Sequence, residues 1–461
     1  MGSVICDTFC VAYLLAPHMS LISPPAWLLP TLALVVGIGI PVWAGHARGR
    51  SYGIFAAVVL AFSFPAGVAL GIRLQALLGP ILGPAVGWLF AYALAVTGVH
   101  FASLVRARLR TRAFRWAVSV PAQAFVALGA LSLPFLLALA PVRIGLWAFD
   151  AAGALSALHW LDLAPIAVIG FSVATSLRPR REIVRVTLGG PEPESLTRLP
   201  VERRGWGKAH QSDRKRSAQR GGAERSHQDR PLRIVQITDP HLGSWAPIHR
   251  LRRRIDALLD HEPDLVLLTG DFLTMEGNGT PGALAEALAP VRRAEGRSFA
   301  IFGNHDHEAP EEVAGALKES GVRLLVDDEA LVETPVGRVQ IVGADWYREN
   351  RRERLQALLA RFPRRSGHLR LLLLHDPRNF HDVPKGEVDL TLSGHTHGGQ
   401  VGLVSLGLDW TVLSRSQWPD HGLFGHGKGR LYVHRGTGFY GFPLRIGVPG
   451  EASVLELVTE S

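Results

Sequence analysis

The sequence predicts an α/β domain with helices on both faces of its sheet, preceded by an all-α region of membrane-spanning length. Residues 27–177 consist mainly of Ala, Leu, Val, Gly and Phe and carry few charges. From Arg178 onward the composition is that of an ordinary water-soluble domain. After residue 232, apolar runs rich in β-branched residues alternate with stretches of helical periodicity, which is typical of α/β domains.

Apolar stretches in the first region are candidates for membrane spans, because a span needs about 20 apolar residues. We place five of them at 26–45, 52–72, 81–104, 116–142 and 158–177. Residues 144–157 are expected at the membrane interface, and Asp162, at the start of the fifth span, is expected to be solvated. Several such runs joined by short connectors argue against buried core helices. We therefore expect residues 1–177 to form a multi-pass domain, integral to the inner or cell membrane.

The basic residues of the connecting loops predict an orientation. Two or more arginines lie in the loops after the first and third spans and in the segment after the fifth, whereas the other two loops carry only Arg73 and Arg143. Basic loops remain on the cytoplasmic side. This alternation predicts an N-terminus outside and a cytoplasmic domain after residue 178.

Much of the net charge of +9 comes from residues 203–230, which contain nine basic and three acidic residues and almost no apolar ones. Such a composition cannot bury a core, so we predict a disordered basic linker within a connector that covers 178–231. A nucleic-acid-binding arm and a patch for anionic lipid headgroups are the alternatives. Trp206 is the only aromatic residue available for base stacking there, so no nucleic-acid partner is expected. Cys6 and Cys10 are the only cysteines, which excludes a disulfide framework or zinc finger in the remainder.

Five short motifs follow one another in the second region, each at or near the end of a predicted strand. The strands are predicted at 232–238, 265–269, 298–302, 369–374 and 388–392. The motifs are Asp239-Pro240-His241, Gly270-Asp271, Gly303-Asn304-His305-Asp306, His375 and Gly394-His395-Thr396-His397. Ligands at the carboxyl ends of strands converge on one edge of a sheet. A further candidate strand at 183–188 is either part of the connector or the first strand of this domain.

The donor types in these motifs indicate metal chemistry. Carboxylates, imidazoles and an amide, without a thiolate, suit two divalent metal ions and phosphoester hydrolysis, with manganese, iron or zinc as candidates. The candidate metal ligands are Asp239, His241, Asp271, Asn304, His375, His395 and His397. His305 is placed to protonate the leaving alkoxide, and Asp306 to orient or charge-stabilise His305. Arg435 and Arg445 are expected either to bind a phosphate or, more often at a strand edge, to be surface charges.

The five motifs together resemble the calcineurin-like metallophosphoesterases, and the resemblance covers about 232–458. The extended ending Gly394-His395-Thr396-His397-Gly398-Gly399-Gln400 is similar to that of a bacterial membrane-associated phosphohydrolase branch. The resemblance implies a four-layer αββα sandwich over 232–461, with His305 as catalytic acid. It implies that Asp239, His241, Asp271 and His397 hold the first metal, and that Asp271, Asn304, His375 and His395 hold the second. Pro240 and Gly450 depart from the family pattern without changing a ligand.

The motifs and the spans together predict a membrane-anchored, metal-dependent phosphoesterase that activates water with two metals. A phosphodiester is the expected substrate, and membrane lipids are candidates because the domain would be tethered beside them. A phosphatase for proteins or nucleotides and a non-catalytic metal-binding scaffold on a membrane sensor remain the alternatives.

Overall fold

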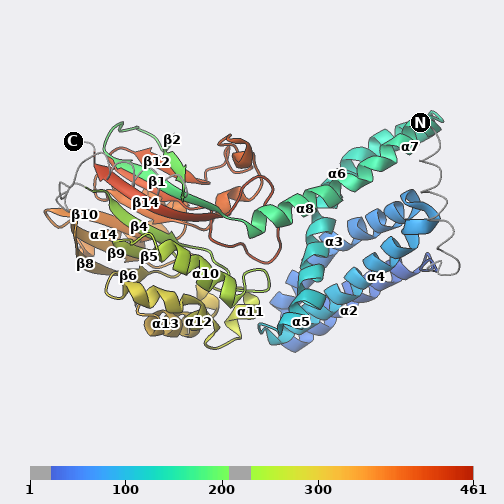
Figure 1. Ribbon diagram of the computed structural model, residues 1–461, viewed down its shortest axis with the longest axis horizontal. Coiled ribbons are helices and arrows are strands. Elements are labelled where there is room, and N and C mark those ends of the chain that lie inside the picture. The colour runs from blue at the N-terminus through green and yellow to red at the C-terminus, as the bar shows by residue number, and fades with distance from the viewer. Residues whose placement is uncertain (1–21, 207–229, 460–461) are drawn as a thin grey trace, which may run out of the picture. The chain divides into compact units, whose positions relative to one another are not determined.

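The computed structural model describes residues 22–206 and 230–459, which form two compact units. The first unit comprises Met1–Val105 and Trp116–Ala167, and the second comprises Arg106–Arg115 and Val168–Ser461. Most of the predicted basic linker lies outside the described residues. Figure 1 shows a helical part and a part that contains all the strands.

Long apolar helices form the N-terminal region. Its main helices are α2 (Leu28–Arg48), α3 (Arg50–Leu77), α4 (Gly79–Ser103), α6 (Val120–Ala148), α7 (Ala152–His159) and α8 (Ala164–Leu177). Short helical segments join them: η1 (Leu104–Arg106), α5 (Arg112–Phe114), η2 (Arg115–Ser119) and η3 (Trp160–Leu163). Among the described residues, five stretches are long and apolar enough to cross a membrane: Leu28–Arg48, Arg50–Leu77, Gly79–Arg106, Arg112–Ala148 and Ala152–Leu177.

Residues 144–157, which we expect at the membrane interface, contain the turn between two helices. Helix α6 continues to Ala148 and α7 begins at Ala152. Asp150, with φ of 51°, makes the tight turn between them, a backbone conformation that Asp and Asn tolerate better than most residues. An interfacial position for this turn stays a prediction.

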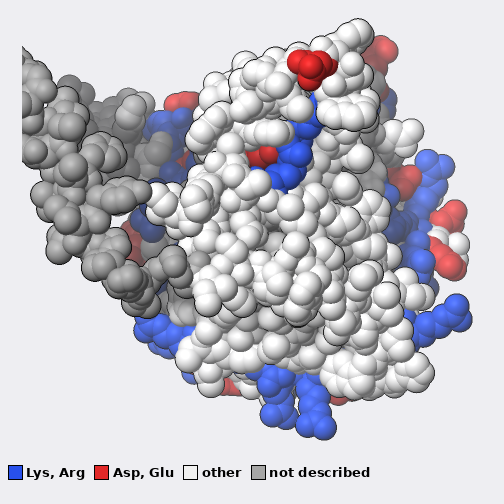
Figure 2. All heavy atoms as spheres, turned by 90° about the vertical axis from the view of Figure 1, so that its right-hand side faces the viewer, with Lys and Arg blue, Asp and Glu red and all other residues white. Residues whose placement is uncertain are grey.

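Asp162 is buried rather than solvated, which corrects the sequence prediction. Its carboxylate is 1% exposed and binds Arg73 Nε at 2.8 Å and Arg143 Nη2 at 2.6 Å. These are the single arginines of the two loops that are otherwise poor in basic residues. In Figure 2 the broad face turned to the viewer is mostly uncharged; a small group of blue and red side chains lies in its upper part, and other charged side chains lie along its edges. The ion pairs join α3, α6 and η3, and a buried acid needs such partners.

Replacing Asp162 with asparagine is expected to destabilise the helical unit by about 3 kcal/mol, because Arg73 and Arg143 would lose their shared counter-charge. The thermal unfolding midpoint of the full chain in detergent measures this effect. Asp150→Asn is the matched control, since Asp150 is exposed and asparagine tolerates its positive φ. Equal midpoints for the two variants would contradict the structural role of Asp162.

The second unit is built on two seven-stranded sheets. The first has the strand order β3-β1-β14-β4-β5-β6-β7, and the second has β2-β12-β13-β11-β10-β9-β8. The strands of the first sheet are β1 (Arg180–Leu188), β3 (Glu202–Gly205), β4 (Leu232–Ile237), β5 (Leu265–Leu268), β6 (Ser298–Ala300), β7 (Arg323–Leu324) and β14 (Glu451–Thr459). Those of the second are β2 (Thr197–Leu199), β8 (Asp328–Thr334), β9 (Gly337–Ala344), β10 (His368–Leu374), β11 (Leu390–Ser393), β12 (Gly422–His426) and β13 (Gly429–Val433).

Helices cover the outer face of each sheet, which gives the αββα sandwich implied by the resemblance. Figure 1 shows α10 (Ile248–Leu259), α12 (Ala283–Leu288) and α13 (Pro310–Glu319) beside the first sheet, and their apolar side chains share one buried cluster with it. A second cluster lies between the sheets, and a third joins the second sheet to α14 (Arg351–Arg361). Burial on both faces explains why the strands read as near-continuous apolar runs.

The strands upstream of residue 232 correct the predicted domain boundary. β1 pairs in parallel with β14 over nine residues, from Arg180↔Glu451 to Leu188↔Thr459. β3 then adds to its other edge. Arg203, expected in the disordered linker, forms an ion pair of 2.6 Å with Glu182. Both faces of β1 are buried: Ile183 packs in the cluster under the helices, whereas Val184 and Val186 pack in the cluster between the sheets.

Candidate metal centre

The strand ends bring the predicted metal ligands together. β4, β5 and β6 run parallel in the first sheet, and β10 and β11 run parallel in the second. Asp239 and His241 follow β4, Asp271 follows β5, Asn304 follows β6, His375 follows β10, and His395 and His397 follow β11. The seven side chains therefore meet where the two sheets present the same ends.

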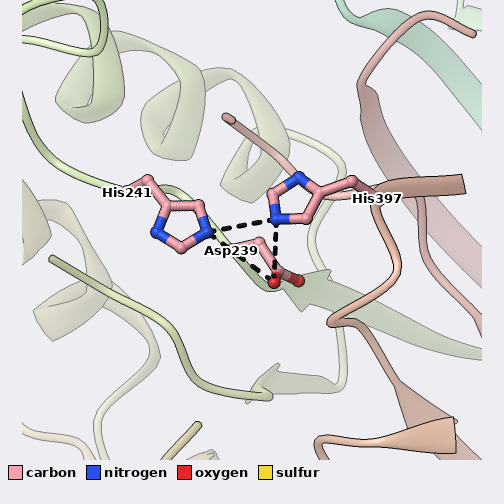
Figure 3. A group of neighbouring side chains, drawn as sticks. All are labelled: Asp239, His241 and His397. Atoms are coloured by element: carbon pink, nitrogen blue, oxygen red, sulfur yellow. Dashed lines mark hydrogen bonds and ion pairs between the residues drawn. The ribbon is translucent and has the colours of Figure 1, made fainter. Parts of the chain in front are cut away.

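Asp239, His241 and His397 form one group that could hold a metal ion. Figure 3 shows the three side chains pointing toward one another. The Nε2 atom of His397 lies 3.1 Å from Nε2 of His241 and 3.3 Å from Oδ1 of Asp239. All three side chains are buried. Nitrogen and carboxylate atoms so close together are suited to sharing one cation.

Asp271, His375 and His395 form a second such group. The Nε2 atom of His375 lies 3.3 Å from Oδ2 of Asp271 and 3.3 Å from Nδ1 of His395. Asn304 turns its amide oxygen to the same place, with Oδ1 at 3.2 Å from Nε2 of His375. The predicted amide ligand therefore stands beside the second group.

Asp271 connects the two groups. Its Oδ2 atom lies 3.3 Å from Nε2 of His375 in the second group and 3.9 Å from Nε2 of His241 in the first. No other carboxylate among the described residues lies within 4.0 Å of histidine nitrogens of both groups. This is the position required of a carboxylate that bridges two cations.

Hydrogen bonds, burial and neighbouring charges set the protonation states of the candidate metal ligands. Nδ1 of His375 lies 2.7 Å from the carbonyl oxygen of Thr269, which fixes the tautomer that leaves Nε2 free as a ligand. Burial lowers the pKa of His241 to about 3 and that of His395 to about 4, so both rings are neutral. Burial would raise the pKa of Asp239, but the neighbouring His397 holds that pKa well below its usual range. Neutral imidazoles and ionised carboxylates fit a divalent cation.

Five of the seven predicted ligands have a left-handed backbone. The φ values are 49° at Asp239, 45° at His241, 58° at Asp271, 69° at His395 and 51° at His397. Such values are uncommon outside glycine and cluster where function requires a particular side-chain direction. The turns aim the side chains inward, across the sheet edge, instead of along the strand.

Two motif glycines leave room for the ligands. A Cβ atom on Gly303 would stand 2.3 Å from Oδ1 of Asp271, and one on Gly394 would stand 2.2 Å from Oδ2 of Asp239. Both separations are far below van der Waals contact. These glycines are therefore required by the close approach of the carboxylates.

His305 lies at the edge of the site, partly exposed. Its ring stacks on Tyr440, with centroids 4.4 Å apart and planes at 17°. Its Nδ1 atom lies 3.1 Å from Oε1 of Glu308. Burial lowers the pKa of His305, but Glu308 and Asp271 raise it more, so the net shift is upward. An upward shift favours the protonated ring, which is the form that can donate a proton.

Asp306 has a different role from the one expected from the sequence. Its carboxylate accepts hydrogen bonds from the backbone N–H groups of Asp271 at 2.7 Å, Phe272 at 2.8 Å and Gly303 at 2.7 Å. The carboxylate beside the His305 ring is that of Glu308, at 3.1 Å from Nδ1. Asp306 therefore fixes the loops that carry Asp271 and Asn304, because unpaired amides in these turns would be costly.

Comparisons with known proteins agree with this geometry. Residues 232–399 match the family described as calcineurin-like phosphoesterase. An uncharacterized metallophosphoesterase, YkoQ of Bacillus subtilis, is 32% identical over 231 residues, which cover 47% of this chain and 80% of that protein. The chain belongs to the calcineurin-like phosphoesterase family. It is a metal-dependent phosphoester hydrolase.

Two other relatives of this phosphoesterase differ in how much of their own length the match covers. Phosphodiesterase YaeI of Escherichia coli is 29% identical over 233 residues, covering 50% of this chain and 83% of that protein. A transmembrane protein with metallophosphoesterase domain from Danio rerio is 29% identical over 245 residues, covering 49% of this chain and 53% of that protein. The latter match thus spans about half of each chain.

Glu308 of the phosphoesterase had no signal in the sequence motifs, yet it supports the protonated form of His305. Replacing Glu308 with glutamine removes a negative charge and is expected to lower the pKa of His305, because Glu308 is the largest of the contributions that raise it. Activity that needs protonated His305 would then be lost at a lower pH. The alkaline limb of the pH profile of kcat is therefore expected to shift to lower pH. An unchanged alkaline limb would contradict this role. Glu311→Gln, on the exposed surface of α13, is the control.

Arg435 and Arg445 of the phosphoesterase are buried, which corrects the surface position expected for them. Arg435 pairs with Glu182 at 3.1 Å and Glu451 at 3.4 Å. Arg445 donates to the carbonyl oxygens of His397 at 3.1 Å and Gly438 at 2.7 Å. Burial lowers the pKa of Arg445 to about 9, and the neighbouring Arg435 adds to the effect. Arg445 supports the loop of His397 from behind and does not face a substrate.

Aromatic and charged residues at the rim of the site were also missed. Trp418 stacks on His395, with centroids 5.8 Å apart, and the Arg378 guanidinium lies 4.1 Å from the centre of the Trp418 ring. Asp376 holds Arg378 through an ion pair of 2.5 Å. Asp376 directly follows a motif histidine, so its position gave a weak signal, whereas Trp418 lies in a segment without any motif.

Proposed function

We propose that this protein is a membrane-anchored phosphodiesterase that uses two divalent cations. Asp239, His241, Asp271 and His397 would hold the first cation, and Asp271, Asn304, His375 and His395 would hold the second. The observation that carries this proposal is the position of Asp271, whose carboxylate lies within 3.9 Å of His241 and 3.3 Å of His375.

The residues of the chain have separable roles in this proposal. When bound, divalent cations supply Lewis acidity toward phosphate oxygens and activate water as the nucleophile. His305, at the rim, donates a proton to the oxygen of the leaving group. Glu308 favours the protonated form of His305, and the Tyr440 ring stacked on His305 limits its rotation. Asp306 acts as a positioning residue through its three backbone hydrogen bonds.

A phosphodiester is favoured over a monoester by two observations. The relative YaeI is named a phosphodiesterase. Two arginines near the metal groups already have partners: Arg445 contacts backbone carbonyls and Nδ1 of His397, and Arg378 pairs with Asp376. The site therefore offers little extra charge for the second negative charge of a monoester. A phosphatase for proteins or nucleotides and a non-catalytic scaffold are the competing functions.

The proposal places the protein in the inner or cell membrane as a multi-pass protein, with the catalytic unit on the cytoplasmic side. The alternation of basic loops supports this orientation. A fusion of green fluorescent protein to Ser461 is expected to fluoresce, whereas alkaline phosphatase fused there is expected to be inactive. Active alkaline phosphatase would place the catalytic unit outside.

The function is tested with the full chain in detergent, loaded with manganese. We expect turnover of bis-p-nitrophenyl phosphate and much slower turnover of p-nitrophenyl phosphate. Turnover of the monoester alone would favour the phosphatase alternative. Bound manganese without turnover of either compound would favour the non-catalytic scaffold.

A further inference from the structure

An apolar hairpin follows the motif that contains His397. Residues 403–412 fold back on themselves, with the N–H of Leu403 donating to the carbonyl oxygen of Trp410 at 2.8 Å. The N–H of Val412 donates to Val401 at 3.0 Å. These bonds close the hairpin at its base, so it is a formed element of the domain.

The hairpin concentrates exposed apolar surface. Among the described residues of 180–459, seven large apolar side chains are exposed, and five belong to the hairpin: Leu403, Leu406, Leu408, Trp410 and Val412. Leu406 is 76% exposed. Only Asp409 and Arg415 are charged between residues 403 and 416. Contiguous exposed apolar residues in a domain whose other surfaces are polar mark an interaction site.

Hydrogen bonds tie the hairpin to residues 446–447 and to Arg180, which follows the last apolar helix. The N–H of Gly402 donates to Ile446 at 2.9 Å and that of Ser405 to Gly447 at 2.7 Å. Arg180 donates through Nη2 to the carbonyl oxygen of Val404 at 3.2 Å. Arg180 is the third residue after Leu177, where α8 ends, and Figure 1 shows α8 leading into β1. The hairpin thus lies beside the exit of α8.

Contacts of α8 hold residues 443–445, the segment before the hairpin's partners Ile446 and Gly447, beside the last turns of this helix. Val168–Leu177 of α8 belongs to the same compact unit as the hairpin. The Ser172 hydroxyl donates to the carbonyl oxygen of Pro443, and the N–H of Arg445 donates to Ser176 at 3.3 Å. Ser172 is five residues from the end of α8, about 7.5 Å along the helix axis. The headgroup region is roughly 5–8 Å thick on each side of a bilayer, so these contacts lie at headgroup level if α8 spans.

We propose that the hairpin 403–412 inserts its apolar side chains into the membrane interface and that the adjacent metal centre takes phosphodiesters carrying a lipid chain. This inference rests on the proposed function. Leu406, Leu408 and Trp410 contact the acyl region, while Asp409 and Arg415 remain among the headgroups. Arg445 bonds to both Ser176 of α8 and the carbonyl of His397. Arg445 therefore connects the end of α8 to a ligand of the metal centre. This connection holds the metal centre close to the lipid headgroups.

The depth of the hairpin is tested in the full chain reconstituted in phosphatidylcholine nanodiscs. With Cys6 and Cys10 replaced by serine, Leu408→Cys provides a single site for a fluorescent label, and Leu331→Cys, at an exposed position on β8, provides the control. Lipids with a nitroxide on the acyl chain are expected to quench the label at 408 and not the label at 331. Equal quenching at both sites would overturn the proposal. Disulfide crosslinking of 408 between two copies, without quenching, would assign the hairpin to a second copy and overturn it as well.

Turnover separates this inference from the proposed function. Hexadecyl p-nitrophenyl phosphate in the nanodisc is compared with soluble bis-p-nitrophenyl phosphate, since both release p-nitrophenol. The double variant Leu406→Ser/Leu408→Ser is expected to lower the ratio of lipid to soluble turnover at least about tenfold, whereas Leu331→Ser leaves that ratio unchanged. An unchanged ratio in the double variant overturns lipid selection by the hairpin. If the wild-type chain hydrolyses neither compound, the phosphodiesterase function is refuted. The quenching experiment would still test whether the hairpin inserts into the membrane interface.

Discussion

Asp271→Ala is expected to lower turnover of bis-p-nitrophenyl phosphate by more than about a thousandfold and to remove metal from both groups. Its carboxylate is within 3.9 Å of His241 and 3.3 Å of His375, so the substitution takes a ligand from each group at once. The neighbouring His375 would also lose the negative charge that, against burial, raises the pKa of His375.

Two measurements accompany this variant: the rate of p-nitrophenol release and the metal content after dialysis. Asp260→Ala, an exposed carboxylate that pairs with Arg293 at 2.9 Å, is the control and should keep both properties. Asp271→Ala with wild-type metal content would show that Asp271 does not connect the two groups.

His305→Ala is expected to lower kcat by about a hundredfold to ten-thousandfold while leaving the metal content unchanged. His305 lies outside both groups of metal ligands, and its ring is held by Glu308 and Tyr440. The loss should be large for a dialkyl phosphodiester, whose leaving alkoxide needs a proton. It should be smaller for bis-p-nitrophenyl phosphate, whose leaving group departs as a stable anion.

His307→Ala is the matched control for this variant. His307 is two residues away, but its ring contacts Asp345 at 3.1 Å rather than the metal groups. The dependence on the leaving group is the decisive readout, because a general loss of structure would lower both rates equally. Equal losses for the two substrates would contradict proton donation by His305.

The sequence contained enough information to predict the strand ends and the residues gathered there. Each ligand follows an apolar run that becomes a buried strand, and parallel strands place their ends at one edge. The αββα layering came only from the family resemblance. The left-handed φ values of Asp239, His241, Asp271, His395 and His397 could not be predicted, because none of these residue types requires such a backbone.

Long-range pairings account for the predictions that the structure corrects. Arg203 looked like part of a disordered basic run, but its partner Glu182 lies in another strand. Asp162 looked solvated because its partners Arg73 and Arg143 are far away in sequence. Arg445 looked like a surface charge because its acceptors are backbone carbonyls, which leave no trace in the sequence. Local pattern identifies the ligands, whereas these supporting contacts depend on tertiary structure.

The number of bound metal ions tests the central claim most directly. We expect the full chain, purified with manganese and measured by inductively coupled plasma mass spectrometry, to bind about two ions per chain. His241→Ala, which removes a ligand of the first group only, should bind about one, and His395→Ala, which affects the second group only, should also bind about one. A single ion in the wild-type chain, or the same content in wild type and both variants, would contradict a centre of two cations joined by Asp271.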